Sequence, residues 1–437
     1  MKKTVVALRT IPALLMALGA SQAHGAGFNL LEQNASGLGN AYAGSAAIAD
    51  NASTIYFNPA GMALLPGGNF SAGLNAIKPS FKFSDDGSTL PLGVTGGSPR
   101  AATGGEGGDA GKWAAVPNIY LSYQLAPQWW VGLGVGAPFG LTTEYEEGWM
   151  GRYHSEKFAI ETINVNPSVA YKVNDQLSLG LGVNWMHIDA DYRLATPAAF
   201  HPVLGPLDMD TRVKMKGDAW GWNAGILYQA TPSTRLGLSY RSQVKITPDG
   251  TTKLRNRNIP AGIPAPDINW DAEATIKLPD TAIFSVVHDL NTRWQLLADV
   301  SWTGWSSIPR LEIENSGPGA QNADLELKFK DAWRVALGAN YHYNEQWTLK
   351  GGVAWDQSPV RDDNYRPTSL PDSDRYWVSI GAQFRPSKNA TWDFGYTHLF
   401  LKNTDINNDS DLAKRGLVRG TYKNSGDILG VQFSYRF

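Results

Sequence analysis

The sequence has 437 residues, a formal net charge of −2 and no cysteine, which excludes a basic nucleic-acid-binding surface, disulfides and thiol chemistry. It is rich in Trp (16), Tyr (17) and Gly (46), yet its mean hydropathy is only −0.27. After the N-terminus it has no apolar run of the roughly 18 residues that a membrane-spanning helix needs. A transmembrane β-barrel agrees with these observations, because its strands alternate membrane-facing apolar residues with lumen-facing polar ones.

The start of the chain has the pattern of a secretory signal peptide. The basic residues Lys2, Lys3 and Arg9 precede an apolar stretch that ends at Ala20, and small residues reach Ala23. We therefore predict a signal peptide over residues 1–23, with cleavage after Ala23, and an exported mature chain.

The next stretch, residues 24–67, fits neither a surface segment nor a membrane strand. It is crowded with Gly, Ala, Ser and Asn, carries almost no charge, and contains Asn58-Pro59-Ala60 near its end. Small, weakly polar residues suit a segment packed inside a larger structure. We predict that residues 24–67 form a hatch in the lumen of a barrel made by residues 68–437.

Alternation of apolar and polar residues predicts fourteen strands in the remainder of the chain. They are expected at about 68–84, 113–125, 129–145, 156–172, 177–193, 212–229, 235–247, 274–288, 294–305, 324–342, 347–358, 375–385, 391–401 and 422–437.

The connections between these strands predict the topology. Short turns such as Ala126-Pro127-Gln128 alternate with long, polar connections such as Asp85 to Lys112 and Pro248 to Glu273. The final stretch alternates strictly, with Leu429 to Phe437 placing apolar residues on one face. This pattern is typical of an all-β, antiparallel outer-membrane barrel with an even number of strands.

Two strands predict the character of the lumen. In the fifth strand the inward set includes Met186, Ile188, Tyr192 and Leu194, which would line an apolar tunnel at the outer end. In the tenth strand we expect Leu325, Leu327 and Phe329 to face outward. This would leave Lys328, Lys330 and Arg334 inside, where charges need water or carboxylate partners.

Several motifs spread over the mature chain resemble the FadL long-chain fatty acid transporters of the bacterial outer membrane. The matching residues are Ala26-Gly27-Phe28, Ser36 to Gly39, Ala41-Tyr42, Ala47 to Asp50, Asn58-Pro59-Ala60, Trp220 to Tyr228, Tyr240 to Ser242, Val244 to Ile246, Phe329 to Ala332, Asp356 to Pro359 and Pro371-Asp372.

The resemblance implies a fourteen-strand barrel, a hatch that moves around Asn58, Pro59 and Ala60, and a ligand site near Phe28. It also implies lateral exit through a kink in the third strand. Here that strand contains Gly136, Pro138, Phe139 and Gly140, and Pro138 cannot donate a ladder hydrogen bond. A simple bulge is the alternative interpretation.

The resemblance departs from the family pattern at the ligand carboxylate. Where family members present an Arg in the fifth strand and a Lys before the tenth, this chain has Leu194 and Leu325. The candidate cations are Arg193, Lys328, Lys330 and Arg334. A one-residue slip would reverse the facing of a strand residue, so the carboxylate partner stays open and an uncharged ligand becomes an alternative.

We therefore predict passive, ligand-gated uptake of long-chain fatty acids across the outer membrane of a Gram-negative bacterium. The chain would act as a monomer in contact with outer-membrane lipid and lipopolysaccharide, without cofactor, metal or nucleic acid. Uptake of monoaromatic hydrocarbons such as toluene is the alternative, and a general porin or a barrel enzyme using His154-Ser155 or His342 ranks below both.

The Asp405 to Asp411 run has carboxylate spacing of a Ca²⁺ loop but lacks its Gly and Glu, which favours a solvated loop.

Overall fold

The computed structural model describes residues 27–437 of the chain. The predicted signal peptide, its cleavage site and residues 24–26 lie outside the described residues.

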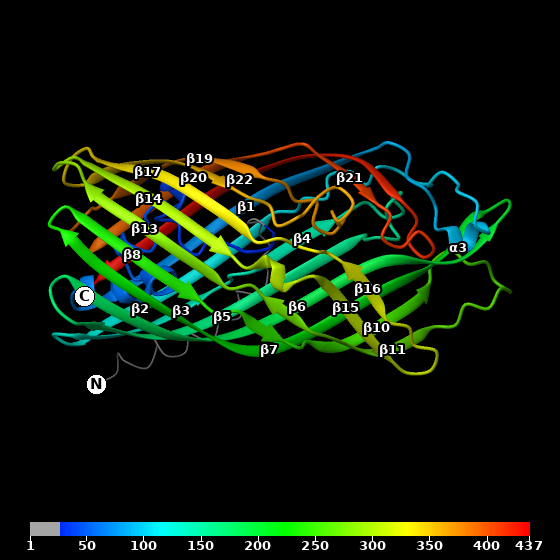
Figure 1. The fold of residues 1–437 in the computed structure, drawn as a ribbon, viewed down its shortest axis with the longest axis horizontal. Coiled ribbons are helices and arrows are strands. Elements are labelled where there is room, and N and C mark those ends of the chain that lie inside the picture. Colours follow the sequence, from blue (N-terminus) through cyan, green and yellow to red (C-terminus); the bar gives the residue numbers. More distant parts are fainter. Residues whose placement is uncertain (1–26) are drawn as a thin grey trace, which may run out of the picture.

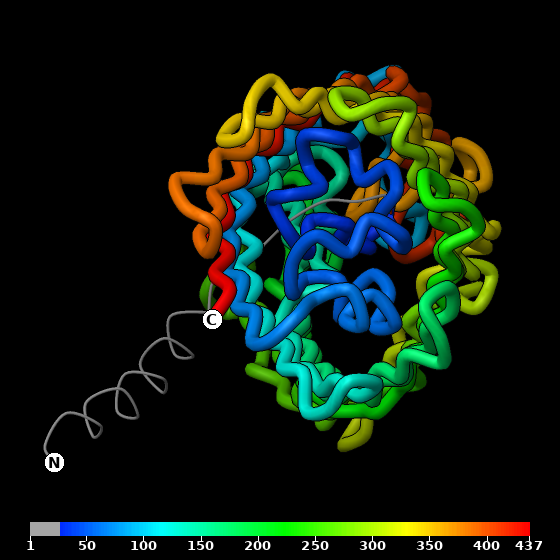
Figure 2. Tube along the Cα trace, turned by 90° about the vertical axis from the view of Figure 1, so that its left-hand side faces the viewer, coloured from blue at the N-terminus to red at the C-terminus, as the bar shows by residue number. Residues whose placement is uncertain are grey.

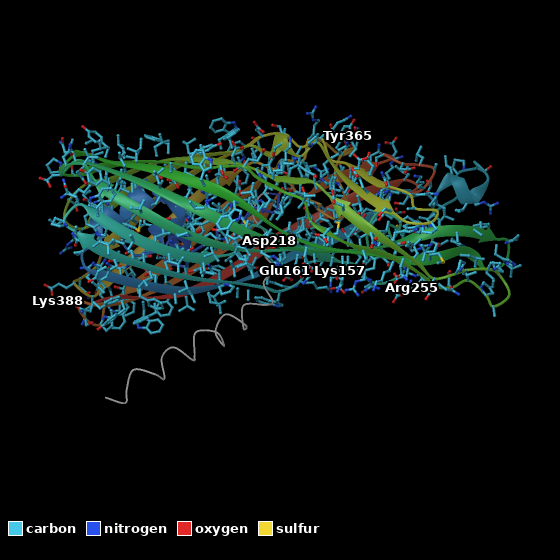
Figure 3. The ribbon with its side chains drawn as sticks, turned by 90° about the horizontal axis from the view of Figure 1, so that it is seen from below. Lys157, Glu161, Asp218, Arg255, Tyr365 and Lys388 are labelled. Atoms are coloured by element: carbon cyan, nitrogen blue, oxygen red, sulfur yellow. The ribbon has the colours of Figure 1, made fainter. Side chains whose placement is uncertain are left out.

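Fourteen antiparallel strands form a closed barrel, which confirms the predicted fold class and strand number. The barrel closes where β1 (Gly68–Asp85) pairs with β2 (Ala114–Ala126) on one side and with β22 (Val418–Arg436) on the other. The carboxyl end lies at the end of the barrel that carries the short turns, and longer extensions leave the opposite end (Figure 1). Lys388, in a short turn, and Arg255 mark these two ends in Figure 3.

Eight barrel strands are continuous and six are divided into shorter segments. The continuous ones, besides β1, β2 and β22, are β5 (Lys157–Lys172), β6 (Leu177–His201), β7 (Gly205–Thr231), β18 (Trp347–Asp356) and β19 (Arg375–Phe384). The divided ones are the third (β3, Trp129–Gly136; β4, Gly140–Glu144), seventh (β8, Thr234–Arg241; β9, Val244–Ile246; β10, Asp249–Asn256), eighth (β11, Ile268–Ala274; β12, Ile276–Leu278; β13, Thr281–Asp289), ninth (β14, Trp294–Thr303; β15, Arg310–Ser316), tenth (β16, Ala323–Glu326; β17, Ala332–His342) and thirteenth (β20, Ala390–Leu401; β21, Thr404–Asn408). Short helices α3 (Leu92–Thr95) and η3 (Trp305–Ser307) lie between strands.

Side-chain burial alternates along the strands as the sequence pattern predicts. In β6, Gly180, Gly182 and Asn184 are buried on the lumen side, whereas Leu181 and Val183 are exposed on the outer surface. The exposed apolar residues form the surface that contacts lipid, and the small buried ones leave room in the lumen.

The fifth and sixth strands are longer than expected. The predicted strands end at 193 and begin at 212, but β6 and β7 stay paired as far as His201 and Gly205. The prolines in residues 194–211 are typical of a loop. In the structure, a register shift between Pro197 and Ala199 forms a β-bulge that accommodates Pro197 within the paired strands. The expected long connection is therefore a protruding hairpin.

The facing predicted for residues 325–330 is wrong. Leu325, Leu327 and Phe329 are buried in the lumen at 8%, 7% and 3% exposure, while Lys328 and Lys330 are partly exposed. The strand breaks between β16 and β17, and Lys328 takes a left-handed backbone conformation with φ of 43°. This break changes which residues face inward, so the alternation of β17 does not extend back to β16.

Residues 27–67, called here the N-terminal segment, lie inside the barrel, where the dark blue trace fills much of the cross-section in Figure 2. The segment contains three short helices, η1 (Leu38–Asn40), α2 (Thr54–Phe57) and η2 (Pro59–Leu64). Its apolar residues Leu38, Tyr42 and Phe57 pack with lumen-facing residues such as Leu297 and Trp377. Residues 27–67 therefore pack inside the barrel.

Candidate functional site

Asn58 fixes the end of the N-terminal segment against the barrel wall. Its side-chain oxygen accepts from the amide of Ala60 at 3.1 Å and so caps η2, while its Nδ2 donates to the carbonyls of Ala46 and Ile226 at 2.7 and 3.0 Å. Glycines make the close approach possible, because a Cβ at Gly225 would lie 1.9 Å from Asn58 Oδ1. Asn58-Pro59-Ala60 therefore acts as a fitted contact with β6 and β7.

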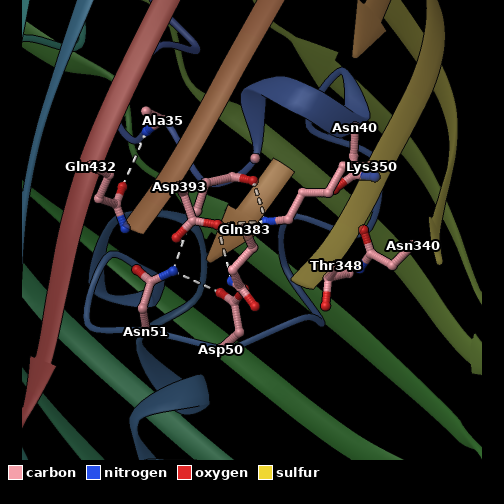
Figure 4. A network of polar contacts seen from close by, with 12 residues as sticks. Ala35, Asn40, Asp50, Asn51, Asn340, Thr348, Lys350, Gln383, Asp393 and Gln432 are labelled. Atoms are coloured by element: carbon pink, nitrogen blue, oxygen red, sulfur yellow. Dashed lines mark hydrogen bonds and ion pairs between the residues drawn. The ribbon is translucent and has the colours of Figure 1, made fainter. Parts of the chain in front are cut away.

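A buried ion pair holds the opposite side of the segment. Lys350 Nζ, in β18, donates to the carbonyl of Ser36 at 2.8 Å and to Asp393 Oδ1 of β20 at 2.9 Å. Both charged side chains are almost fully buried, at 3% and 1% exposure. The amide of Ala35 also donates to Gln432 of β22 at 3.1 Å, and Figure 4 shows these anchors around the segment.

Glu32 is the one acidic side chain of the N-terminal segment that is fully buried. Neither carboxylate oxygen has a hydrogen-bond partner among the described residues. Burial raises the pKa of Glu32 to about 8, even though the nearby Arg375 and Arg334 favour the charged form. The carboxyl is therefore held mainly protonated at neutral pH in this position.

Phe28 lies at the centre of a large apolar cluster in the lumen. Its ring centroid is 4.7 Å from that of Trp305 in an edge-to-face arrangement and 5.9 Å from that of Phe139. The other buried members of this Phe28 cluster are Leu141, Ile160, Met186, Ile188, Val244, Ile246, Ile276, Leu278, Ile308, Leu325, Leu327, Phe329, Ala332, Val360 and Leu370. The interrupted strands seven to ten contribute most of them, since the short segments of these strands direct apolar side chains into the lumen near Phe28.

The third strand breaks at residues 137–139, within the predicted kink. Gly136 pairs with Asn164 and Gly140 with Glu161, so the third strand contains one residue more than β5 between these pairs. On the other side, the ladder from β2 to β3 ends at the pair Ile119 and Val135. The break thus has one extra residue against β5, as a β-bulge does, with three residues facing two. On the side of β2 it lacks a regular neighbour.

The N-terminal segment fills the place of that missing neighbour. Asn29 forms an antiparallel bridge with Phe139, Leu30 donates to the carbonyl of Pro138 at 2.8 Å, and Gly140 donates to the carbonyl of Phe28 at 2.9 Å. Of the predicted kink residues, Pro138, Phe139 and Gly140 are buried beneath this contact, and Gly136 ends β3.

The predicted tunnel residues lie in two adjoining apolar clusters. Met186 and Ile188 belong to the Phe28 cluster. Tyr192 belongs to a second cluster nearer the outer end with Val213, Met215, Ala272, Ala274 and Ile313, against which Leu194 packs. Phe158 and Leu311 contact both clusters. The apolar lining is therefore continuous from the outer hairpins to Phe28.

The four candidate cations lie in different surroundings. Arg193 is on the outer face of β6, 3.8 Å from Asp210, and Lys328 contacts Glu326 and Tyr365 at 2.9 and 2.7 Å. Arg334 points into the lumen but donates to the carbonyl of Ala41, so it binds the N-terminal segment. Lys330 follows Phe329 of the cluster, and its ammonium has no ion pair among the described residues.

Comparison with known proteins identifies the family. Residues 16–437 match the family described as outer membrane protein transport protein (OMPP1/FadL/TodX). The chain belongs to this family. It is therefore an outer-membrane transporter of a Gram-negative bacterium, as the sequence motifs predicted.

Relatives of the FadL family cover nearly the whole chain. A long-chain fatty acid transport protein of Escherichia coli is 31% identical over 460 residues, covering 97% of each chain. Outer membrane protein P1 of Haemophilus influenzae is 32% identical over 467 residues, covering 98% of this chain and 99% of that one. A solved FadL homologue from Pseudomonas aeruginosa is 25% identical with a TM-score of 0.84, over 94% of this chain and all of the other. The toluene transporter TbuX of Ralstonia pickettii shares the fold with a TM-score of 0.66 at 18% identity, over 93% and 100% of the two chains.

Sequence reasoning missed two parts of this FadL-family site. Trp305 was assigned to the end of a strand, but it sits in η3 and is fully buried against Phe28. The flanking Gly304 and Pro309 were a signal for a break there. Lys350 and Asp393 gave no local signal, because each lies in a regular strand. They meet only across the intervening strand β19.

Residues 27–437 also bear on metal binding, membrane-spanning helices and the His154-Ser155 pair. Groups of three or more potential metal ligands are absent from this range. Within the same range, no helix has the length and apolar character needed to cross a membrane. The ring of His154 contacts the carbonyl of Gly416 at 3.2 Å, and the Ser155 hydroxyl has no hydrogen-bond partner among these residues.

Proposed function

We propose that this FadL-family protein takes up long-chain fatty acids passively, with gating by the N-terminal segment. The observation that carries the proposal is the continuous apolar lining, which leads from the outer hairpins through the Tyr192 cluster to Phe28. Each buried CH₂ of an alkyl chain contributes about 0.8 kcal/mol, so such a lining can capture a scarce ligand from water. The fatty acid relatives at about 30% identity support the same substrate class.

In this proposal a ligand that displaces Phe28 moves the N-terminal segment away from the third-strand break. Phe28 and Gly140 share a backbone hydrogen bond, so a shift of Phe28 removes the neighbour that covers residues 137–139. The exposed break then offers lateral exit into the outer membrane. Asn58-Pro59-Ala60 stays bound to β6 and β7, and the segment moves about this anchor.

Lys330 is the proposed partner for the ligand carboxylate. The other three candidates already bind Asp210, Glu326 with Tyr365, or the carbonyl of Ala41. Lys330 directly follows Phe329 of the Phe28 cluster in the chain, and its side chain is partly exposed.

Uptake of monoaromatic hydrocarbons is the second candidate. It is favoured by the apolar side chains of Met186, Ile188 and Leu325 in the Phe28 cluster. A small aromatic ligand needs no charge partner.

Binding of oleate, methyl oleate and toluene to the purified, detergent-folded protein tests the proposal. Saturable oleate binding that weakens about tenfold on esterification is the expected result. If toluene binds and oleate does not displace it, the proposed substrate is a monoaromatic hydrocarbon and not a fatty acid.

A further inference from the structure

The barrel wall is also interrupted between the eighth and ninth strands. The β13–β14 ladder ends at the pair Thr281 and Thr303, and the β11–β15 ladder resumes only at Ala274 and Ile313. Between them the two chains are joined by the Gly304 amide to the Asp280 carbonyl at 3.0 Å and the Ser307 hydroxyl to the Lys277 carbonyl at 3.2 Å. Residues 275–280 and 304–312 are called the wall break below.

The wall break holds a cavity that faces the outside of the barrel. Its volume is about 210 Å³, and its inner side is formed by Ile276, Ile308 and Leu311. Ile276 and Ile308 are also buried members of the Phe28 cluster, against which Leu311 packs. A single layer of apolar side chains thus separates this outer cavity from the interior ligand site.

The wall break lies at the outer edge of the lipid-facing surface. In the neighbouring strands the outward apolar residues run from Leu296 through Val300, and the exposed Trp333 pairs with Trp302, the second residue before Gly304. Exposed aromatic residues mark the membrane interface. An amphiphile that has partitioned into the outer leaflet therefore reaches the cavity without passing through the long loops.

Two lysines give this cavity an anion-binding end. Lys277 lines it, and Lys245 is directly opposite Lys277 in the β9–β12 pair, so two exposed like charges are neighbours across the strands. Neither ammonium has an ion pair among the described residues. By contrast, Arg310 at the other end is 3.6 Å from Glu312, and Glu314 adds a further carboxylate there.

We propose that the wall break is a binding site for a fatty carboxylate arriving from the outer leaflet, with its head group on Lys245 and Lys277. The inference rests on the proposed uptake of fatty acids and adds a second point of access to it. A cavity of about 210 Å³ is smaller than the 300–1,000 Å³ of a typical whole-ligand pocket. It takes the first part of the alkyl chain, and the remainder follows between Ile276 and Ile308 into the Phe28 cluster.

Residues 305–308 connect the cavity to the N-terminal segment. Ile308 is in the segment that follows η3, and Trp305 of η3 packs on Phe28 and covers Gly27, where a Cβ would lie 2.6 Å from the indole. A chain that parts Ile308 from Ile276 therefore moves Trp305 against Phe28.

Photo-crosslinking of the detergent-folded, full-length barrel tests this site. The probe is a long-chain fatty acid with a diazirine near its carboxylate, and cross-linked peptides are identified by mass spectrometry. We expect adducts within residues 275–278 and 307–311 of the wild type. Replacing both lysines (K245Q with K277Q) should lower these adducts about fivefold, whereas K402Q with K423Q, at two other exposed lysines, should leave them unchanged.

A second variant fills the cavity without touching the interior site. Thr275 is exposed and lines the cavity, so T275W should abolish adducts at the wall break, and T231W in a short turn serves as its control. Wild-type protein that binds oleate but gives adducts only elsewhere would overturn this inference and leave the proposed function intact. Wild-type protein that does not bind oleate would overturn both. A competition experiment distinguishes a lipid phosphate as the occupant. If lipid A removes the adducts and an equal amount of neutral phospholipid does not, the site binds a lipid phosphate instead of a fatty carboxylate.

Discussion

The backbone amide of Leu30 donates a hydrogen bond to the carbonyl of Pro138 over 2.8 Å. Together with the bond from Gly140 to Phe28, it makes the N-terminal segment the neighbour of the third strand where β2 is not paired. A buried backbone carbonyl that loses such a partner carries a desolvation cost of about 1–3 kcal/mol. The segment and the break therefore stabilise each other, and movement of one requires rearrangement of the other.

Deleting Pro138 should close the third-strand break. The third strand has one residue more than β5 between the pairs Gly136–Asn164 and Gly140–Glu161, so the deletion restores one-to-one pairing and leaves both flanking registers in place. Uptake of labelled oleate into proteoliposomes should fall to background, while oleate affinity in detergent stays within about twofold.

The length-preserving variant P138A is the matched control for this deletion. It keeps the extra residue and should transport nearly as well as the wild type. Undiminished transport by the deletion variant would rule out exit through the third strand.

The docking of the N-terminal segment should weaken as pH rises. Burial raises the pKa of Glu32 to about 8 from an ordinary value of 4.5, so the docked carboxyl keeps a proton that the released one loses. Docking is then strongest below about pH 4.5 and weakens as pH rises through about 8. Single-channel conductance in planar bilayers should show more frequent opening at high pH. In E32Q, which stays neutral, this dependence should disappear, and an equal dependence in E32Q would assign it to another group.

Breaking the Lys350–Asp393 pair should release the N-terminal segment. The variant K350M leaves Asp393 buried without its cation and the carbonyl of Ser36 without its donor. Loss of one partner of a buried pair costs about 3–5 kcal/mol, so ion leakage through the barrel should rise strongly. The double variant K350M with D393L removes both charges and should leak less than K350M. If the double variant leaks more, the pair does not act as the anchor described above.

Reversing the charge at Lys330 should separate the two candidate substrates. K330E reverses the charge at the position that follows Phe329 and should weaken oleate binding about tenfold, with little effect on toluene binding. Isothermal titration with both ligands measures this difference. Equal effects on the two ligands would exclude Lys330 as the carboxylate partner, and K388E in a short turn controls for changes in net charge.

Much of the fold follows from local patterns. Alternation in strands such as β6 and β18, and the turns between them, were enough to predict fourteen strands and the lumen-facing set of Met186 and Ile188. The pattern fails where a strand breaks. Between Phe329 and Ala332, close to the positive φ of Lys328, the buried positions change from odd to even numbers, and nothing in a period of two signals such a change.

The site was less predictable because its parts meet from distant places in the sequence. Phe28 and the third-strand kink were expected from the family resemblance, but the contact of Phe28 with Trp305 depends on how the ninth strand leaves the wall. The partners of the candidate cations were unpredictable for the same reason. Arg193 faces outward near Asp210, whereas Arg334 donates to the N-terminal segment. Only the three-dimensional arrangement decides between these surroundings.

The bond from Ala35 to Gln432 joins residues 397 positions apart, and Asn75 of β1 donates to the carbonyl of Glu32 at 2.8 Å. The N-terminal segment is thus attached to both strands of the β1–β22 seam. That seam has the greatest loop-closure cost in the barrel, since it joins the most distant strands. Because the N-terminal segment bonds to both of these strands, it ties together the two ends of the barrel sequence at the point where the ring closes.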